Sequence, residues 1–154
     1  MEEEREISRE PSVGEDPYKG EWDQPDSYER GDGGLVPGIE RRDEFVVEGP
    51  LLTDVGGTIG VSVLSTPAMV GLIERTSAIL AFERLPEGKA TVGFEICVKH
   101  VAAAPEGSTC AVTSRLREVV DDRKLRFDVE VKDGERTIGV GTHERRVIDV
   151  GRLD

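Results

Sequence analysis

Three polar residues of this sequence have side chains that could act together on a carbonyl group: Thr66, Glu74 and His100. A threonine hydroxyl can attack a carbonyl carbon when a nearby base takes its proton. Histidine suits the role of that base, because its ordinary pKa lies close to neutral pH. A glutamate also becomes a base near neutral pH when burial raises its pKa. The three residues lie far apart in the sequence, so only the fold can bring them together.

Each of the three also has a simpler structural interpretation. Thr66 precedes Pro67, and a threonine N-cap followed by proline at the first helical position is a common helix start. No basic residue lies three or four positions from Glu74, but an ion pair with Arg75 or with an arginine on a strand would account for this carboxylate. His100 follows a strand-like segment, where a histidine is usually exposed or hydrogen-bonded. Spacing alone leaves both interpretations open.

One long helix is predicted over residues 67–84. Its apolar residues lie nearly all round, which is typical of a helix buried on more than one side, and Pro86 and Gly88 end it. Eight helical residues from Thr66 to Glu74 correspond to a rise of ~12 Å. Two short side chains at that distance cannot both contact one carbonyl carbon. Either His100 and a water bridge them, or the site combines residues from two subunits of a symmetric dimer.

Alternation of apolar and polar residues predicts strands over residues 43–48, 91–101, 109–119, 125–131 and 136–149. Asp133-Gly134 is a typical hairpin turn between the last two. The pattern over residues 51–64 is compatible with either a short strand or a lid beside Gly56-Gly57. Gly139 and Gly141 lie inside the last predicted strand and indicate a bend or a close backbone approach. The whole pattern is α+β, with one long central helix wrapped by a curved antiparallel sheet.

The acidity of the chain is concentrated at its N-terminus. The net charge is -12, and residues 1–34 contribute 8 of these negative charges with no apolar periodicity. We therefore expect residues 1–34 to form a disordered acidic tail and residues 35–154 to form one folded domain. No basic patch is available for a nucleic acid, and no apolar run is long enough to span a membrane. Neither partner is expected.

Two cysteines, Cys97 and Cys110, do not make a disulfide framework, and each is expected to be a small buried strand residue. The acidic start at Met1 is unlike a signal peptide, so a cytoplasmic location is predicted. The sequence has no metal-ligand spacing, phosphate-binding glycine loop, dinucleotide fingerprint or nucleophile elbow. No metal and no cofactor is expected.

Several segments together resemble one known family. The segments are Thr66, Gly71-Leu72-Ile73-Glu74, Thr91-Val92-Gly93-Phe94-Glu95-Ile96-Cys97-Val98-Lys99-His100, Ala102-Ala103-Ala104-Pro105-Glu106-Gly107 and Gly139-Val140-Gly141-Thr142-His143-Glu144-Arg145. In this order and spacing they resemble the fluoroacetyl-CoA thioesterase-like family of hot-dog fold thioesterases, over roughly residues 64–150. The resemblance implies a hot-dog homodimer that hydrolyses acyl-CoA thioesters.

The resemblance also implies roles for individual residues. Thr66, Glu74 and His100 match the family's catalytic set, Gly93 matches the glycine beside the acyl pocket, and Arg145 matches an arginine near the site. The expected function is therefore hydrolysis of a small acyl-CoA thioester. Because residues 55–60 contain no aromatic lid residue, an acyl group other than fluoroacetyl is favoured. The alternative is a non-catalytic hot-dog module that binds an acyl-CoA or another small ligand.

Overall fold

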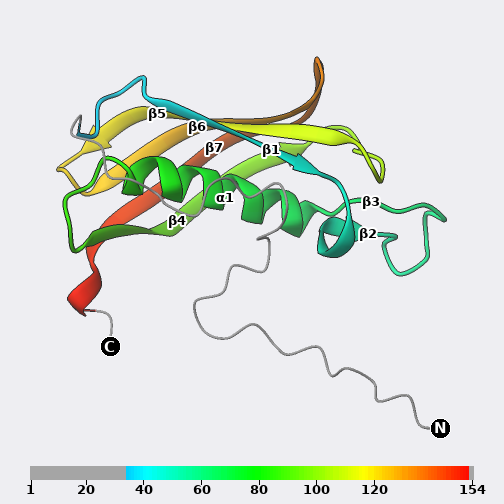
Figure 1. Cartoon of the computed structure of the whole chain (residues 1–154), viewed down its shortest axis with the longest axis horizontal. Helices are drawn as coiled ribbons and strands as arrows, with labels where there is room; N and C mark the ends of the chain where they lie inside the picture. Colours follow the sequence, from blue (N-terminus) through cyan, green and yellow to red (C-terminus); the bar gives the residue numbers. More distant parts are fainter. Residues whose placement is uncertain (1–33, 153–154) are drawn as a thin grey trace, which may run out of the picture.

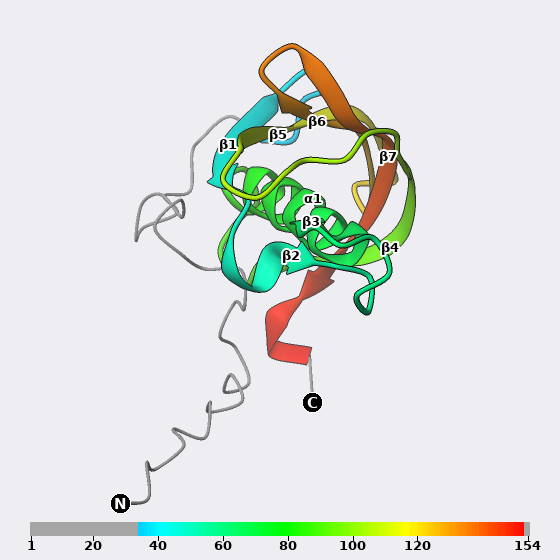
Figure 2. The same ribbon diagram turned by 90° about the vertical axis from the view of Figure 1, so that its right-hand side faces the viewer.

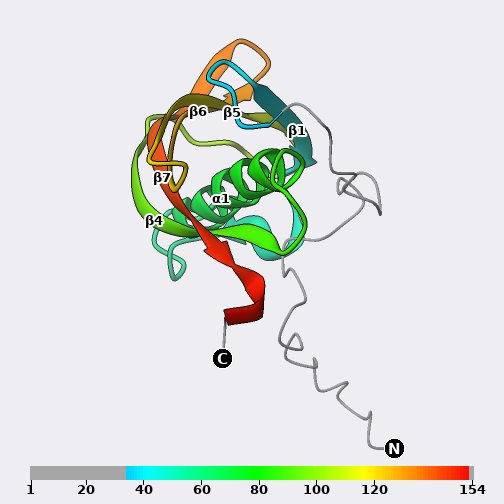
Figure 3. The same ribbon diagram turned by 90° about the vertical axis from the view of Figure 1, so that its left-hand side faces the viewer.

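A long helix, α1 (Thr66–Phe82), lies inside a curved sheet of five antiparallel strands (Figure 1). The computed structural model describes residues 34–152. The strands are β1 (Glu40–Val46), β4 (Lys89–His100), β5 (Thr109–Val120), β6 (Lys124–Asp133) and β7 (Arg136–Asp149). Views along the helix show the sheet curling around it from β1 to β4 (Figures 2 and 3). The predicted α+β architecture is confirmed. Apart from Gly34, the tail predicted to be disordered lies outside the described residues.

Residues 51–64 contain short strands, one of the two possibilities that the sequence left open. A 3-10 turn η1 (Gly49–Leu51) leads into β2 (Leu52–Thr53), which pairs with β3 (Val63–Leu64) in a separate two-stranded sheet. Residues 54–62 form the loop between them, beside the N-terminal end of α1 (Figure 2). A second 3-10 turn, η2 (Val150–Arg152), follows β7.

The sheet order, β1-β5-β6-β7-β4, differs from the order along the chain. Strands β4 and β5 follow each other in sequence but lie at opposite sides of the sheet, because residues 101–108 cross from one side to the other. Within residues 34–152, β4 therefore pairs only with β7 and leaves one edge unpaired. The β4–β7 register shifts between Gly93 and Glu95, so Phe94 is the extra residue of a β-bulge.

The helix is buried on most of its circumference, as its sequence predicted. The fully buried side chains that it contributes include Met69 and Ile73, which pack with Phe45 of β1 and Phe127 of β6 in one apolar core. Burial of this kind, rather than helix propensity, stabilises a helix of this length in a protein. The core thus fixes α1 against the inner face of the sheet.

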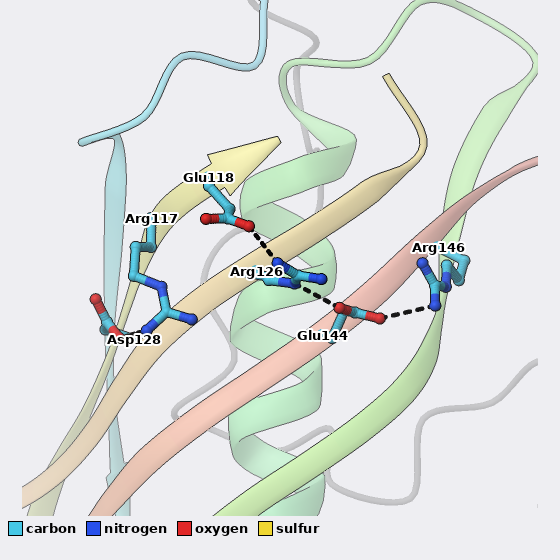
Figure 4. A network of polar contacts seen from close by, with 6 residues as sticks. All are labelled: Arg117, Glu118, Arg126, Asp128, Glu144 and Arg146. Carbon is cyan, nitrogen blue, oxygen red and sulfur yellow. Dashed lines mark hydrogen bonds and ion pairs between the residues drawn. The ribbon is translucent and has the colours of Figure 1, made fainter. Parts of the chain in front are cut away.

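The face of the sheet that points away from α1 carries a ladder of alternating charges (Figure 4). Arg126 of β6 pairs with Glu118 of β5, and its Nε lies 2.7 Å from Glu144 of β7. Glu144 also pairs with Arg146 at 2.9 Å, and the Arg146 guanidinium lies 3.8 Å from the centre of the Phe94 ring. The hydrogen bond from Arg126 lowers the pKa of the Glu144 carboxyl. Oppositely charged neighbours therefore join β5, β6 and β7 across this face.

Two glycines of β7 permit close contact with neighbouring elements, and at Gly141 this contact is the close backbone approach that the sequence offered as one of two possibilities. A Cβ atom at Gly141 would lie 2.1 Å from the carbonyl oxygen of Cys97 on β4. A Cβ atom at Gly139 would lie 2.6 Å from the Sδ of Met69 on α1. Any larger residue at these two positions must displace the β4 backbone at Gly141 or the Met69 side chain at Gly139.

The two glycines provide a matched pair of substitutions. Gly141→Ala is expected to reduce the free energy of unfolding by about 3 kcal/mol, because its methyl group meets rigid backbone. Gly139→Ala is expected to cost less, because Met69 has a flexible side chain that can change rotamer. Urea unfolding of both variants measures the difference. Equal losses would show that the backbone contact at Gly141 is not the cause.

Candidate active site

Thr66 and His100 are in direct contact. The Oγ1 of Thr66 lies 2.8 Å from the Nδ1 of His100. Thr66 is the first residue of α1 and His100 is the last residue of β4, so the contact joins the start of the helix to the end of an edge strand. The fold therefore brings together two of the three residues on which the expected chemistry depends.

The prediction that Thr66 is the N-cap of the helix is wrong. Ser65 is the N-cap: its backbone is extended, with φ -74° and ψ 151°, and its hydroxyl accepts a hydrogen bond from the Ala68 N–H at 3.1 Å. Serine and threonine are both good caps, and local sequence does not decide between neighbours. Since Ser65 caps the helix, the Thr66 hydroxyl is available to His100.

His100 is partly buried, and this burial lowers its pKa below the ordinary value of 6.5, although an interaction with the Ala102 backbone acts in the opposite direction. The imidazole is therefore neutral at neutral pH, and its Nδ1 can accept the Thr66 proton. The other ring nitrogen, Nε2, is buried and has no hydrogen-bond partner among residues 34–152. An acceptor at this atom would stabilise a buried N–H.

Glu74 does not reach Thr66 or His100 within the chain. Its side chain is 43% exposed, and its Oε2 lies 3.6 Å from the NH1 of Arg145. A strand arginine is thus its ion-pair partner, one of the alternatives considered from the sequence. A Cβ atom at Gly93 would lie 2.8 Å from the same Oε2, so the glycine leaves room for the carboxylate. Glu74, Gly93 and Arg145 form a second cluster.

Arg145, the buried member of this cluster, is held in a fixed orientation, with only 7% of its side chain exposed. Its Nε donates to the Thr91 hydroxyl at 2.7 Å, and its NH2 donates to the Thr91 carbonyl at 3.0 Å. Its NH1 lies 3.3 Å from the Nε2 of His143. Because arginine only donates, His143 carries its proton on Nδ1, which donates to the Glu95 carbonyl at 2.7 Å.

The supporting roles of His143 and Thr91 were not recognised from the sequence. Burial lowers the pKa values of both His143 and Arg145, which keeps His143 neutral at neutral pH. His143 and Arg145 are two residues apart on one strand, so they share a face of the sheet. This spacing of two residues in a predicted strand was the sequence feature from which a contact between His143 and Arg145 could have been predicted.

The two clusters lie far apart along β4. Thr66 contacts His100 at the end of the strand, whereas Glu74 lies beside Gly93. The intervening strand residues correspond to a separation of roughly 20 Å. One chain therefore presents two halves of the expected catalytic set rather than one assembled site.

The two cysteines differ in their surroundings. Cys110 is buried, as expected, and burial raises the pKa of its thiol. Cys97 is exposed on β4, so the expectation of a buried residue is wrong for this cysteine.

Among the residues that the structure describes, no group of three or more His, Cys, Asp or Glu side chains is arranged to hold a metal ion. No helix of that region has the length and apolar character needed to cross a membrane.

A long helix inside a curved antiparallel sheet of five strands defines a hot-dog fold. A solved hot-dog-like protein from Thermanaerovibrio acidaminovorans, 22% identical, has the same fold with a TM-score of 0.70. The match covers 76% of this chain and 86% of that protein. Residues 50–151 match the model of the family described as fluoroacetyl-CoA-specific thioesterase. The chain belongs to that family.

Proteins named as fluoroacetyl-CoA thioesterases are more similar to this chain in sequence than the hot-dog-like protein is. The fluoroacetyl-CoA thioesterase of Streptantibioticus cattleyicolor is 41% identical over 92 residues, which span 60% of this chain and 66% of that protein. The solved structure of the fluoroacetyl-CoA thioesterase FlK is 34% identical, with a TM-score of 0.70 over 78% of this chain and 93% of that chain. A variant of FlK, solved in complex with fluoroacetate and CoA, has a TM-score of 0.67 at 34% identity over 78% of this chain and 100% of that chain.

Proposed function

We propose that the protein is an acyl-CoA thioesterase that hydrolyses a small acyl thioester, with Thr66, Glu74 and His100 as its catalytic residues. The hydrogen bond of 2.8 Å between Thr66 and His100 carries this proposal, because it joins a nucleophile to a neutral base. The relatives named for fluoroacetyl-CoA hydrolysis support the class of reaction.

The chemistry needs only side chains of the protein and water. His100 Nδ1 takes the hydroxyl proton as the Thr66 oxygen forms a bond to the thioester carbonyl carbon. The C–S bond then breaks, and the CoA sulfur receives the proton from His100. Water then attacks the acyl-threonine while His100 accepts its proton. The bond to the Thr66 oxygen breaks, that oxygen takes the proton back from His100, and the free acid is released. In a variant of this route, Thr66 holds a water that attacks directly. An acyl group bonded to Thr66 in protein that is rapidly quenched during turnover would establish the route in which the threonine oxygen attacks.

The active form is proposed to be a homodimer in which Glu74 comes from the partner subunit. Within one chain the Glu74 carboxylate of α1 lies beside Gly93 near the middle of β4, whereas His100 ends that strand, and His100 Nε2 is buried without a partner among residues 34–152. A carboxylate from the partner subunit would accept the Nε2 proton and stabilise the imidazolium formed during the reaction. Arg145 and Gly93 are then positioning residues: Arg145 forms an ion pair with the Glu74 carboxylate, and Gly93 leaves room for it.

The acyl group is proposed to be short and different from fluoroacetyl. The loop over residues 54–62 presents Val55, Ile59 and Val61 as its exposed apolar side chains, and none of its residues is aromatic. Aliphatic side chains lack the polarised ring edge that an aromatic ring offers to a fluorinated group. A cytoplasmic location remains our prediction.

Release of free thiol from a panel of acyl-CoA thioesters, from acetyl to hexanoyl and including fluoroacetyl, tests this function. Turnover is expected with at least one short unfluorinated member and is expected to be lost in His100→Ala. The rival function is a non-catalytic module that binds an acyl-CoA. Tight binding of the panel by the intact protein without thiol release would establish the rival and overturn the proposal.

A further inference from the structure

One nitrogen of Arg145 lies between a buried histidine and the carboxylate of Glu74. The NH1 atom of Arg145 is 3.3 Å from the Nε2 of His143 and 3.6 Å from the Oε2 of Glu74. The hydrogens of NH1 lie in the guanidinium plane and point in fixed directions. When one of them is donated to His143, the direction of the other is set as well. His143 therefore determines how Arg145 faces the carboxylate.

His143 is held by both strands that flank β7. Its side chain is buried, and its ring stacks on the Phe127 ring of β6 with 6.2 Å between the ring centres. Its Nδ1 lies 2.7 Å from the carbonyl oxygen of Glu95 on β4. Because a carbonyl only accepts, Nδ1 carries the proton, and Nε2 of the neutral ring is an acceptor. Burial lowers the pKa of His143, and the charge of Arg145 acts in the same direction. The ring is thus fixed in one orientation and one tautomer.

The β-bulge of β4 lies between the two backbone positions that this arrangement uses. Phe94 is the extra residue between Gly93 and Glu95. On one side of it, Gly93 leaves room for the Glu74 carboxylate, and on the other side the Glu95 carbonyl accepts the Nδ1 proton of His143. Bulges are common beside active sites, where they redirect a side chain or a backbone group. The irregularity of this strand therefore belongs to the second cluster.

We propose that His143 is a positioning residue for the reaction: it fixes the guanidinium of Arg145 and, through it, the carboxylate of Glu74. This inference rests on the proposed function in taking Glu74 as a catalytic group. The Glu74 side chain is 43% exposed, so packing alone leaves it several rotamers, and a fixed guanidinium favours one of them. A catalytic group displaced by about 1 Å can lose on the order of 10²-fold in rate.

Two substitutions separate the donor of the imidazole from its acceptor. His143→Gln can place its amide oxygen near the position of Nε2, where it accepts from Arg145. His143→Asn can place its amide N–H near the position of Nδ1, where it donates to Glu95, but it offers Arg145 no acceptor. If the histidine served only to hold β4, the asparagine variant would be the better substitute.

His143→Asn is expected to lower kcat on the order of 10²-fold, and His143→Gln should retain about tenfold more activity than His143→Asn. KM should change little in either variant, because the carboxylate acts on the imidazolium that forms in the transition state. Steady-state thiol release measures both constants, and thermal melts check the fold. An asparagine variant as active as the glutamine variant would overturn the proposal.

A double-mutant cycle shows whether His143 acts through Glu74. In the Glu74→Gln background, the further substitution His143→Asn is expected to lower kcat less than about threefold, because the group that it positions is already gone. A residue that only stabilises the fold would cost the same factor in both backgrounds. Loss of the full factor in the Glu74→Gln background would therefore contradict the positioning role.

Nuclear magnetic resonance tests the arrangement without any substrate. At neutral pH, the nitrogen shifts of His143 in the wild-type protein should show a protonated Nδ1 and an unprotonated Nε2. The Nε–H of Arg145, which donates to Thr91, should exchange with water about tenfold faster in His143→Asn than in the wild type. The opposite tautomer, or an exchange rate that does not respond to the substitution, would overturn the proposal.

These readouts separate the inference from the proposed function. If the protein hydrolyses no thioester but the exchange of Arg145 responds to position 143, His143 fixes the guanidinium and the proposed function alone fails. If hydrolysis is present but neither kcat nor the exchange rate responds to His143→Asn, the function stands and the positioning role alone fails.

Discussion

Replacement of His100 by alanine is expected to lower kcat about 10²–10⁴-fold, the usual contribution of a positioned general base. The substitution removes the nitrogen that lies 2.8 Å from the Thr66 hydroxyl, so no group takes the threonine proton. Steady-state thiol release with the best acyl-CoA substrate measures the loss. A thermal melt of the same variant checks that the fold remains intact.

The pH profile of the wild-type protein gives an independent readout for His100. The imidazole is a base only when neutral, and burial lowers its pKa below 6.5. The value of kcat/KM should therefore be constant through neutral pH and decline only as the pH falls below 6.5 toward this lowered pKa. Residual activity of His100→Ala should lack this acid limb. An unchanged limb in the variant, or a loss smaller than threefold, would assign the base to another group.

Mixing Thr66→Ala chains with Glu74→Ala chains is expected to restore about a quarter of the wild-type activity. Random pairing makes half of the dimers mixed, and each mixed dimer regains one of its two sites if Glu74 acts on the partner subunit's His100. Each variant alone should be nearly inactive. The measurement is thiol release after the two chains are unfolded and refolded together.

The controls for this experiment follow from the structure. Ser65 caps α1, so Thr66→Ala should not shift the melting temperature appreciably. The Glu74 side chain is 43% exposed and its ion pair spans 3.6 Å, so Glu74→Ala should also fold. If the mixture is no more active than the separate variants, all three catalytic groups act within one chain. That result would refute the shared site, while leaving thioester hydrolysis as the function.

The sequence by itself determined the elements of this fold. Apolar residues on most sides of one helical segment required a helix buried within a sheet, and period-two alternation after Gly88 required strands. These patterns are local, because each depends on the solvent exposure of residues a few positions apart. The glycines at 139 and 141 also predicted a close approach, because only glycine removes the Cβ atom.

The tertiary structure alone decided how those elements meet. Adjacent Ser65 and Thr66 have nearly equal cap propensity, and packing of the helix start assigned the cap to Ser65 and left Thr66 for His100. The crossing of residues 101–108, which makes β4 an edge strand, depends on pairings between residues distant in sequence. Local periodicity carries no information about such pairings, so neither the free edge nor the separation of Glu74 from His100 followed from sequence pattern.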